Sequence, residues 1–97
     1  MARFSDAQTR LIASRAHALT DVTRIRILDV LSRAEQPVGR IAAALAQEPS
    51  TISKHLQVLF RAGFVERRRL ASTVIYSLVD ARLLEWCRYL SHRIVKA

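Results

Sequence analysis

Apolar residues recur at three- and four-residue steps along the first two thirds of the chain, which is the spacing of one face of a helix. The pattern predicts four helices, over residues 4–19, from the capping residue Asp21 to about residue 35, over 38–45 and over 49–62. Gly63 follows the fourth helix, where a left-handed cap is wanted. Because the third and fourth helices are short and closely connected, we expect them to form a helix-turn-helix.

The pattern changes after Gly63. Residues 64–70 and 73–78 are rich in β-branched, aromatic and alternating side chains, and Ala71-Ser72 separates them, which predicts a β-hairpin. Asp80 opens a last helix with an apolar face. The predicted order is ααααββα, mainly α with a small β-hairpin, and this is the order of a winged helix-turn-helix in a single domain over residues 1–97.

Composition narrows the class of partner. The chain has 97 residues, with 16 Lys and Arg against 8 Asp and Glu, and this formal net charge of +8 favours nucleic acid. The only cysteine, Cys87, cannot form an internal disulfide, and no membrane span or leader is evident, so we expect a cytoplasmic protein. A chain of this length has room for one core, and a homodimer would bury more apolar surface.

The predicted fourth helix has an apolar inner stripe and a polar outward face. The inner stripe consists of Ile52, Leu56, Leu59 and Phe60. The outward residues are Ser50, Thr51, Ser53, Lys54 and Gln57, whose side chains can hydrogen-bond base edges and phosphates in a major groove. A merely solvated face usually carries Glu–Lys pairs, whereas this one has no acidic residue after Glu48, so we favour a DNA-recognition helix.

Arginines gather beside this helix. The set expected to contact the DNA backbone, and to give an affinity that falls with salt, is Arg40, Arg61, Arg67, Arg68 and Arg69. A competing explanation for charged strands is protection of an exposed sheet edge against aggregation, and it accounts for part of the run.

In three successive segments the sequence resembles ArsR/SmtB-type repressors. Residues 18–28 resemble the second helix of that family, residues 51–59 its recognition helix, and residues 62–76 its wing. The resemblance implies a homodimer formed by the first and last helices, with two recognition helices in successive major grooves of a palindromic operator and release by a metal or another signal. It also makes His55 a structural or phosphate-contacting residue of the recognition helix.

Apolar stripes on both terminal helices support such a dimer independently, because a domain of this size would struggle to cover them. The expected interface residues are Phe4, Leu11, Leu83, Cys87, Leu90 and Ile94. The chain departs from the family pattern at four positions that bear on turn and wing geometry: Ala46 and Ala71 where glycine is usual, Gln47 where an apolar residue is usual, and Val22 where proline is common.

The two metal sites of the family are not matched. The Cys-x-Cys positions of the third helix read Pro37 and Gly39. On the last helix only Asp80 remains of the ligand set, and cations that would repel a metal occupy the other positions, Arg82, Arg93 and Lys96. We therefore expect no metal and no cofactor, and leave the effector open.

The remaining soft ligands are Cys87 and three histidines. His17, His55 and His92 could gather with Cys87 across a dimer, but no ligand spacing supports this. Cys87 is interpreted as a packing residue in preference to a disulfide switch, because reactive thiols need accessible and electropositive surroundings.

Catalysis is not expected, because the sequence has no Gly-rich phosphate loop, no paired carboxylates and no nucleophile–base arrangement. The alternative function is a winged helix used as a protein- or RNA-interaction module. Readers of single-stranded RNA usually display aromatic residues for stacking, and the wing and recognition face offer only Tyr76, so duplex DNA is favoured.

Overall fold

Helix boundaries follow the capping residues of the sequence. Helix α1 (Asp6–His17) begins after Ser5, whose Oγ accepts a hydrogen bond from the Gln8 N–H at 3.1 Å while the Ser5 N–H donates to Gln8 Oε1 at 2.9 Å. This capping box starts the helix two residues later than the apolar spacing indicates. Helix α2 (Val22–Leu31) begins after Asp21, as predicted, with Asp21 Oδ1 accepting from the N–H of Arg24 at 3.1 Å.

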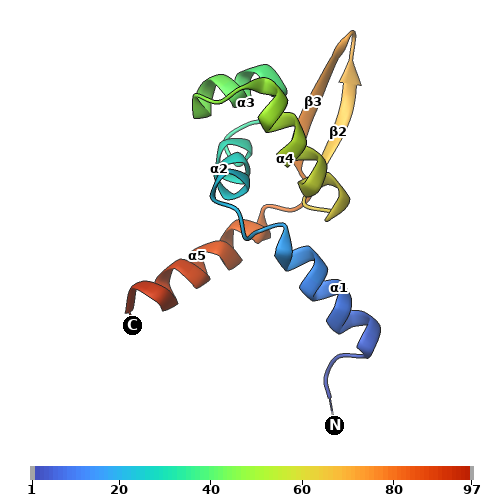
Figure 1. Cartoon of the computed structure of the whole chain (residues 1–97), viewed down its shortest axis with the longest axis vertical. Helices are drawn as coiled ribbons and strands as arrows, with labels where there is room; N and C mark the ends of the chain where they lie inside the picture. Colours follow the sequence, from blue (N-terminus) through green and yellow to red (C-terminus); the bar gives the residue numbers. More distant parts are fainter. Residues whose placement is uncertain (1, 97) are drawn as a thin grey trace.

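The computed structural model describes the backbone of residues 2–96 and the side chains of residues 2–92. Within that part of the chain the core lies between α2, α3 (Val38–Leu45) and α4 (Pro49–Arg61). The fully buried side chains are Ile27, Leu28, Ile41, Ile52, Leu56, Leu59 and Val65. Figure 1 shows the three helices packed around this centre with the hairpin beside α4.

The predicted hairpin is β2 (Val65–Leu70) and β3 (Thr73–Leu78), which pair antiparallel. A third strand, β1 (Gln36–Pro37), pairs with β3, so the sheet order is β1-β3-β2. Two residues, one of them a proline, carry no alternating pattern, and so the sequence does not predict this strand. The short pairing attaches the hairpin to the start of α3, and the winged helix-turn-helix is confirmed with one strand added.

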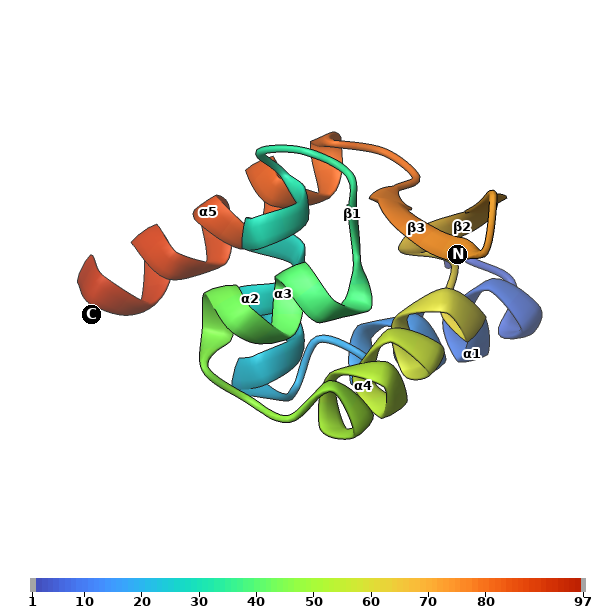
Figure 2. The same cartoon turned by 90° about the horizontal axis from the view of Figure 1, so that it is seen from above.

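Helices α1 and α5 (Arg82–Lys96) extend away from the core. None of the residues of α1 is buried, and in the views of Figures 1 and 2 the far end of α5 points away from the hairpin. Within residues 2–96, no helix combines the length and the apolar character needed to span a bilayer.

Among residues 2–96, three hold a left-handed backbone. Gly63 has φ 85°, as expected of the cap after α4. Ala46, which ends α3, and Ala71, at the hairpin turn, have φ 54° and 56°. The turn and wing geometries are thus of the kind that glycine usually supplies, although alanine occupies both positions.

Candidate nucleic-acid interface

One face of α4 is polar and open to solvent. Of the predicted recognition residues, Ser50, Thr51, Lys54 and Gln57 are exposed, while Ile52, Leu56 and Leu59 on the opposite face are fully buried. Pro49 occupies the first turn, where its missing N–H leaves no helical hydrogen bond unmade. The amphipathic spacing predicted from the sequence therefore fixes which side of α4 is available to a ligand.

The other two predicted recognition residues, Ser53 and His55, are half-buried. The Nδ1 atom of His55 lies 3.2 Å from a terminal guanidinium nitrogen of Arg24 and 3.9 Å from Asp21 Oδ1. His55 thus connects α4 to the start of α2, and its contact with DNA stays a prediction.

Arg24 is a residue that sequence reasoning missed. Its Nε donates to the carbonyl oxygen of Ala18 at 2.7 Å. Its backbone N–H donates to the Asp21 side chain, and this hydrogen bond lowers the pKa of the Asp21 carboxyl. The side chain of Arg24, at the start of α2, therefore contacts both the turn after α1 and His55 of α4. Arg24 lies inside the segment that resembles the family, but no spacing rule links it to a partner 31 residues away.

Phe60 corrects the predicted inner stripe of α4. Its side chain is 37% exposed, and the guanidinium carbon of Arg67 lies 4.1 Å from the centroid of its ring. Phe60 comes one residue after Leu59 and is therefore rotated about 100° from that buried side chain, toward the base of the hairpin, where it meets Arg67. The ring is a cation–π partner of the wing and not part of the core.

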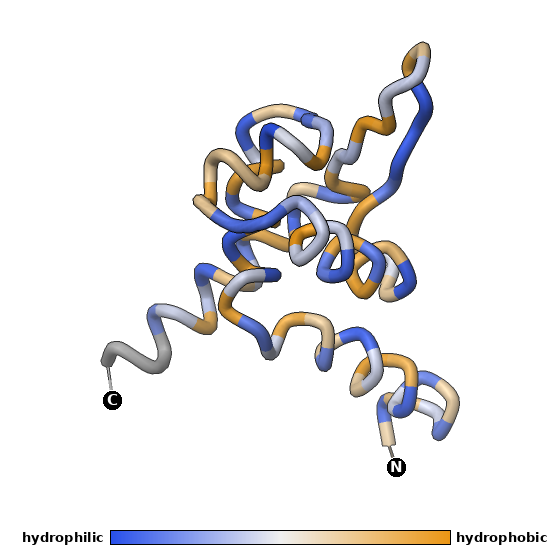
Figure 3. The backbone as a smooth tube through the Cα atoms, turned by 45° about the horizontal axis from the view of Figure 1, so that its top comes forward, coloured by the Kyte–Doolittle hydropathy of each residue, from blue (hydrophilic) through white to orange (hydrophobic). Residues whose placement is uncertain are grey.

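The three consecutive arginines of β2 divide between two faces. Arg67 and Arg69 share one face of the strand with the buried Val65, whereas Arg68 points to the other, because successive side chains of a strand alternate. Arg68 forms an ion pair with Glu35, in the segment before β1. Figure 3 shows the hydrophilic run of β2 leading to the tip of the hairpin.

The remaining backbone candidates are Arg40 on α3 and Arg61 at the end of α4, and both are exposed. Arg61 donates to Gln57 Oε1 at 3.4 Å. Arg61 therefore lies with Gln57 beside the hairpin base, while Arg40 belongs to a separate element.

Gln47 accounts for one departure from the family pattern. Its side chain is half-buried, and Nε2 donates to the hydroxyl oxygen of Thr23 on α2 at 3.2 Å. An amide can stand at a position that is usually apolar because α2 offers it a polar partner.

The predicted dimer residues lie on the two projecting helices or, for Phe4, just before the first of them. Phe4, just before α1, is 56% exposed, Leu11 is exposed, and Leu90 is 39% exposed, whereas Leu83 and Cys87 are half-buried. The side chain of Ile94 lies outside the described residues. Sequence reasoning did not include Trp86 and Tyr89, which are also exposed on α5.

Cys87 faces the domain. It lines a hollow of about 380 Å³ between α2 and α5, together with Leu28, Leu84 and Arg26, and burial raises the pKa of the thiol above its ordinary value of 9.0. The thiol is therefore protonated at neutral pH, as suits a packing residue more than a sensor.

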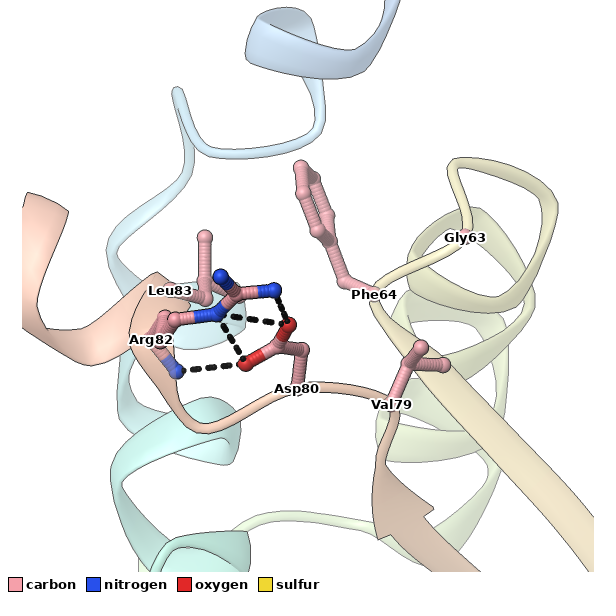
Figure 4. Close-up of a pocket in the computed structure, with 6 residues that line it drawn as sticks. All are labelled: Gly63, Phe64, Val79, Asp80, Arg82 and Leu83. Atoms are coloured by element: carbon pink, nitrogen blue, oxygen red, sulfur yellow. Dashed lines mark hydrogen bonds and ion pairs between the residues drawn. The ribbon is translucent and has the colours of Figure 1, made fainter.

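Asp80 is engaged by the neighbouring Arg82. Asp80 lines a hollow of about 440 Å³ between the end of the hairpin and the start of α5. Figure 4 shows its carboxylate facing the guanidinium of Arg82. The side chain of Arg82 donates to both carboxylate oxygens, from Nε at 3.0 to 3.1 Å and from a terminal nitrogen at 2.6 Å. These bonds, with a further one from the Arg82 N–H, hold the pKa of Asp80 at about 2.

The family's metal site on the last helix does not fit these residues, because the one carboxylate that remains is bound by a guanidinium. Among the side chains that the structure describes, no three or more His, Cys, Asp or Glu residues gather as metal ligands.

Comparison with known proteins places the chain among bacterial regulators. Residues 21–67, from the cap of α2 to the middle of β2, match the model of "Bacterial regulatory protein, arsR family". The HTH-type transcriptional regulator NmtR of Mycobacterium tuberculosis is 35% identical over 86 residues, which cover 86% of this chain and 72% of NmtR. The chain belongs to the ArsR family.

Two further proteins resemble this ArsR-family member. A transcriptional repressor SmtB homolog of Synechocystis is 33% identical over 81 residues, which are 84% of this chain and 61% of that protein. The solution structure of a homodimeric winged helix-turn-helix DNA-binding domain from Mycobacterium bovis, a possible ArsR-family regulator, has 31% identity and a TM-score of 0.85, over 99% of this chain and 94% of that domain. Membership of the ArsR family confirms the prediction that the chain is a winged helix-turn-helix transcriptional regulator.

Proposed function

We propose that this ArsR-family regulator is a repressor that binds a palindromic DNA operator as a homodimer, without catalytic activity. The observation that carries the proposal is the exposed, acid-free polar face of α4 next to the arginines of β2. A helix fits the major groove of B-DNA, and the exposed Ser50, Thr51, Lys54 and Gln57 offer donors and acceptors to base edges and phosphates.

The wing supplies the sequence-independent part of this proposed interface. Arg61, Arg67 and Arg69 are exposed near α4 or on the face of β2 that packs toward it, and they would contact phosphates and set the register of the helix in the groove. Half-buried Ser53 and His55 would act mainly by holding α4 in place.

A role in RNA or protein interaction has less support. Tyr76, the aromatic residue of the two hairpin strands, is 6% exposed and belongs to the core, so neither strand offers a ring on which an unpaired base would stack. The exposed ring of Phe60, at the hairpin base, is already in contact with the guanidinium of Arg67. The relatives are regulators of transcription, which agrees with duplex DNA as the partner.

The dimer rests on the exposed apolar side chains of the two projecting helices, and the similar domain from M. bovis is itself described as homodimeric. A pair of recognition helices related by a two-fold axis reads two half-sites that are about 34–36 Å apart. Palindromic DNA is therefore the operator that such a dimer would select.

The test is a titration of the full chain against the DNA upstream of its own gene and against a scrambled duplex of equal length, at one fixed salt concentration. We expect preference for the upstream DNA. Gln57→Ala should weaken that binding roughly tenfold and reduce the preference, because a base contact is worth about 1–3 kcal/mol.

If Lys54 contacts a phosphate, Lys54→Ala should weaken binding to both duplexes to the same extent. The matched control is Arg26→Ala, which removes one positive charge on α2, facing the hollow toward α5 and away from α4. Equal affinity of the unaltered chain for both duplexes would contradict an operator-reading regulator.

A further inference from the structure

The junction between the end of α4 and the base of the hairpin forms a small hollow of unusual chemistry. It measures about 250 Å³ and is lined by Gln57, Phe60, Arg61 and Arg67. Two guanidinium groups, one amide and one aromatic ring thus meet in one place, and none of the lining residues is acidic.

Arg67 is held in this hollow by two features. In the β2–β3 register it pairs with Tyr76, which is 6% exposed, so Arg67 shares the strand face that packs on the core and on α4. Its guanidinium then lies 4.1 Å from the centroid of the Phe60 ring. The ring limits where the cation can go without neutralising it, since a cation–π contact leaves the N–H groups at the guanidinium edge free to donate.

Arg68 provides the contrast within the same strand. It lies on the opposite face of β2 and is ion-paired with Glu35. Of these neighbouring arginines, one has a carboxylate partner and the other has an aromatic partner. The Phe60 ring holds Arg67 in place but does not neutralise its positive charge. That charge is therefore available to an anion that approaches the wing.

The second cation reinforces the first. Arg61 lies one residue after Phe60 and bonds to the amide oxygen of Gln57 at 3.4 Å, which directs it along α4. The end of a helix carries about half a negative charge, which disfavours an anion there. Two full positive charges at the same hollow outweigh that half charge.

We propose that Phe60, Arg61 and Arg67 form a phosphate site for the duplex backbone at the edge of the major groove, in which Phe60 is the positioning residue for Arg67. This inference deepens the proposed function and rests on it. Phe60 contributes no charge and acts through the arginine, whereas the helical spacing alone had assigned it to the buried inner stripe.

The test is a double-mutant cycle on DNA affinity with the full chain, measured on the upstream and scrambled duplexes over a range of salt concentrations. Arg67→Ala should weaken binding to both duplexes. It should also reduce the slope of log affinity against log salt by about 1.8, because each of the two protomers loses one phosphate contact worth about 0.9. Phe60→Leu keeps an apolar side chain but loses the ring face, and should weaken binding about two- to fivefold. Phe60→Tyr should restore it.

The double variant Phe60→Leu/Arg67→Ala should bind no more weakly than Arg67→Ala alone, because the ring acts only through the arginine. A merely structural role of Phe60 would instead give additive losses and a lowered thermal midpoint. Unchanged or tighter binding of Phe60→Leu would overturn the proposal, as would a loss confined to one base sequence.

The two proposals can fail separately. Equal binding of the unaltered chain to both duplexes contradicts operator recognition but leaves the phosphate site testable on either duplex. Sequence preference that survives in Phe60→Leu with full affinity contradicts the phosphate site alone.

Discussion

Ala46 and Ala71 hold backbone conformations that L-residues rarely adopt. Both lie in the left-handed region, where the Cβ atom crowds the following carbonyl oxygen at a cost of about 1–2 kcal/mol. Ala46 ends α3 and its N–H bonds to the carbonyls of the last turn, while Ala71 turns the chain between β2 and β3. Each conformation is imposed by the elements on either side.

Glycine at either position should stabilise the fold. Ala46→Gly and Ala71→Gly remove the steric cost but add freedom to the unfolded chain, so we expect each to raise the free energy of unfolding by about 0.5–1 kcal/mol. The measurement is denaturant unfolding followed by circular dichroism. Ala43→Gly, on the exposed side of α3, is the control and should cost about 1 kcal/mol. If all three glycine variants were less stable than the unaltered chain, Ala46 and Ala71 would not be under backbone strain.

The hydrogen-bond partners of individual side chains were harder to predict from the sequence than the turns of the backbone. The positions of Ala46 and Ala71 stand out in the sequence because glycine is usual there, and the structure places both in turns. The contacts of Arg24 with His55 and of Gln47 with Thr23 join residues 31 and 24 positions apart, and local pattern carries no information about such pairs. The exposed face of α4 was predictable because it follows from helical periodicity alone.

At the scale of elements, the β2–β3 hairpin presents its arginines on two opposite faces. A run of three arginines in the sequence indicates one basic patch, but the strand alternation sends Arg68 to the side of Glu35 and Arg67 to the side of α4. The face of each residue could have been predicted from the hairpin register. The partners could not, because Glu35 reaches the wing through β1, whose two residues carry no strand signal.

Glu35 competes with DNA for Arg68. In Glu35→Gln the arginine loses its charged partner and becomes available to a phosphate, so DNA affinity should rise by about two- to fivefold at low salt. Fluorescence anisotropy with a labelled duplex measures this change.

The matched control is Glu66→Gln, which changes the net charge equally at an exposed position of the same strand. If both variants tighten binding to the same extent, the gain is a general charge effect and the ion pair does not restrain Arg68.

At the scale of the whole molecule, the chain is extended for its length. The radius of gyration is 14.7 Å, whereas a compact chain of this length would have about 12.5 Å. The difference reflects α1 and α5, which leave the domain and carry exposed Leu11, Trp86 and Leu90. We expect a second copy of the chain to cover these exposed apolar side chains.

Leu90→Glu should dissociate the proposed dimer. Two-fold symmetry places the new charge at the interface twice, and burying it without a partner should raise the dimer dissociation constant by at least about a hundredfold. Sedimentation velocity distinguishes monomer from dimer. His92→Glu introduces an acidic side chain at an exposed position about 160° around α5 from Leu90, and this variant should remain dimeric. A Leu90→Glu protein that also remains dimeric would place the interface elsewhere.

That α1 buries none of its residues within its own chain also affects how the regulator responds to its abundance. If assembly orders this helix, mass action makes folding and pairing one equilibrium, and dilution works against both. Well below the dimer dissociation constant, the amount of DNA-competent species rises with the square of the chain concentration. Halving synthesis would then cut operator occupancy about fourfold, which gives the cell a steep threshold set by protein level alone.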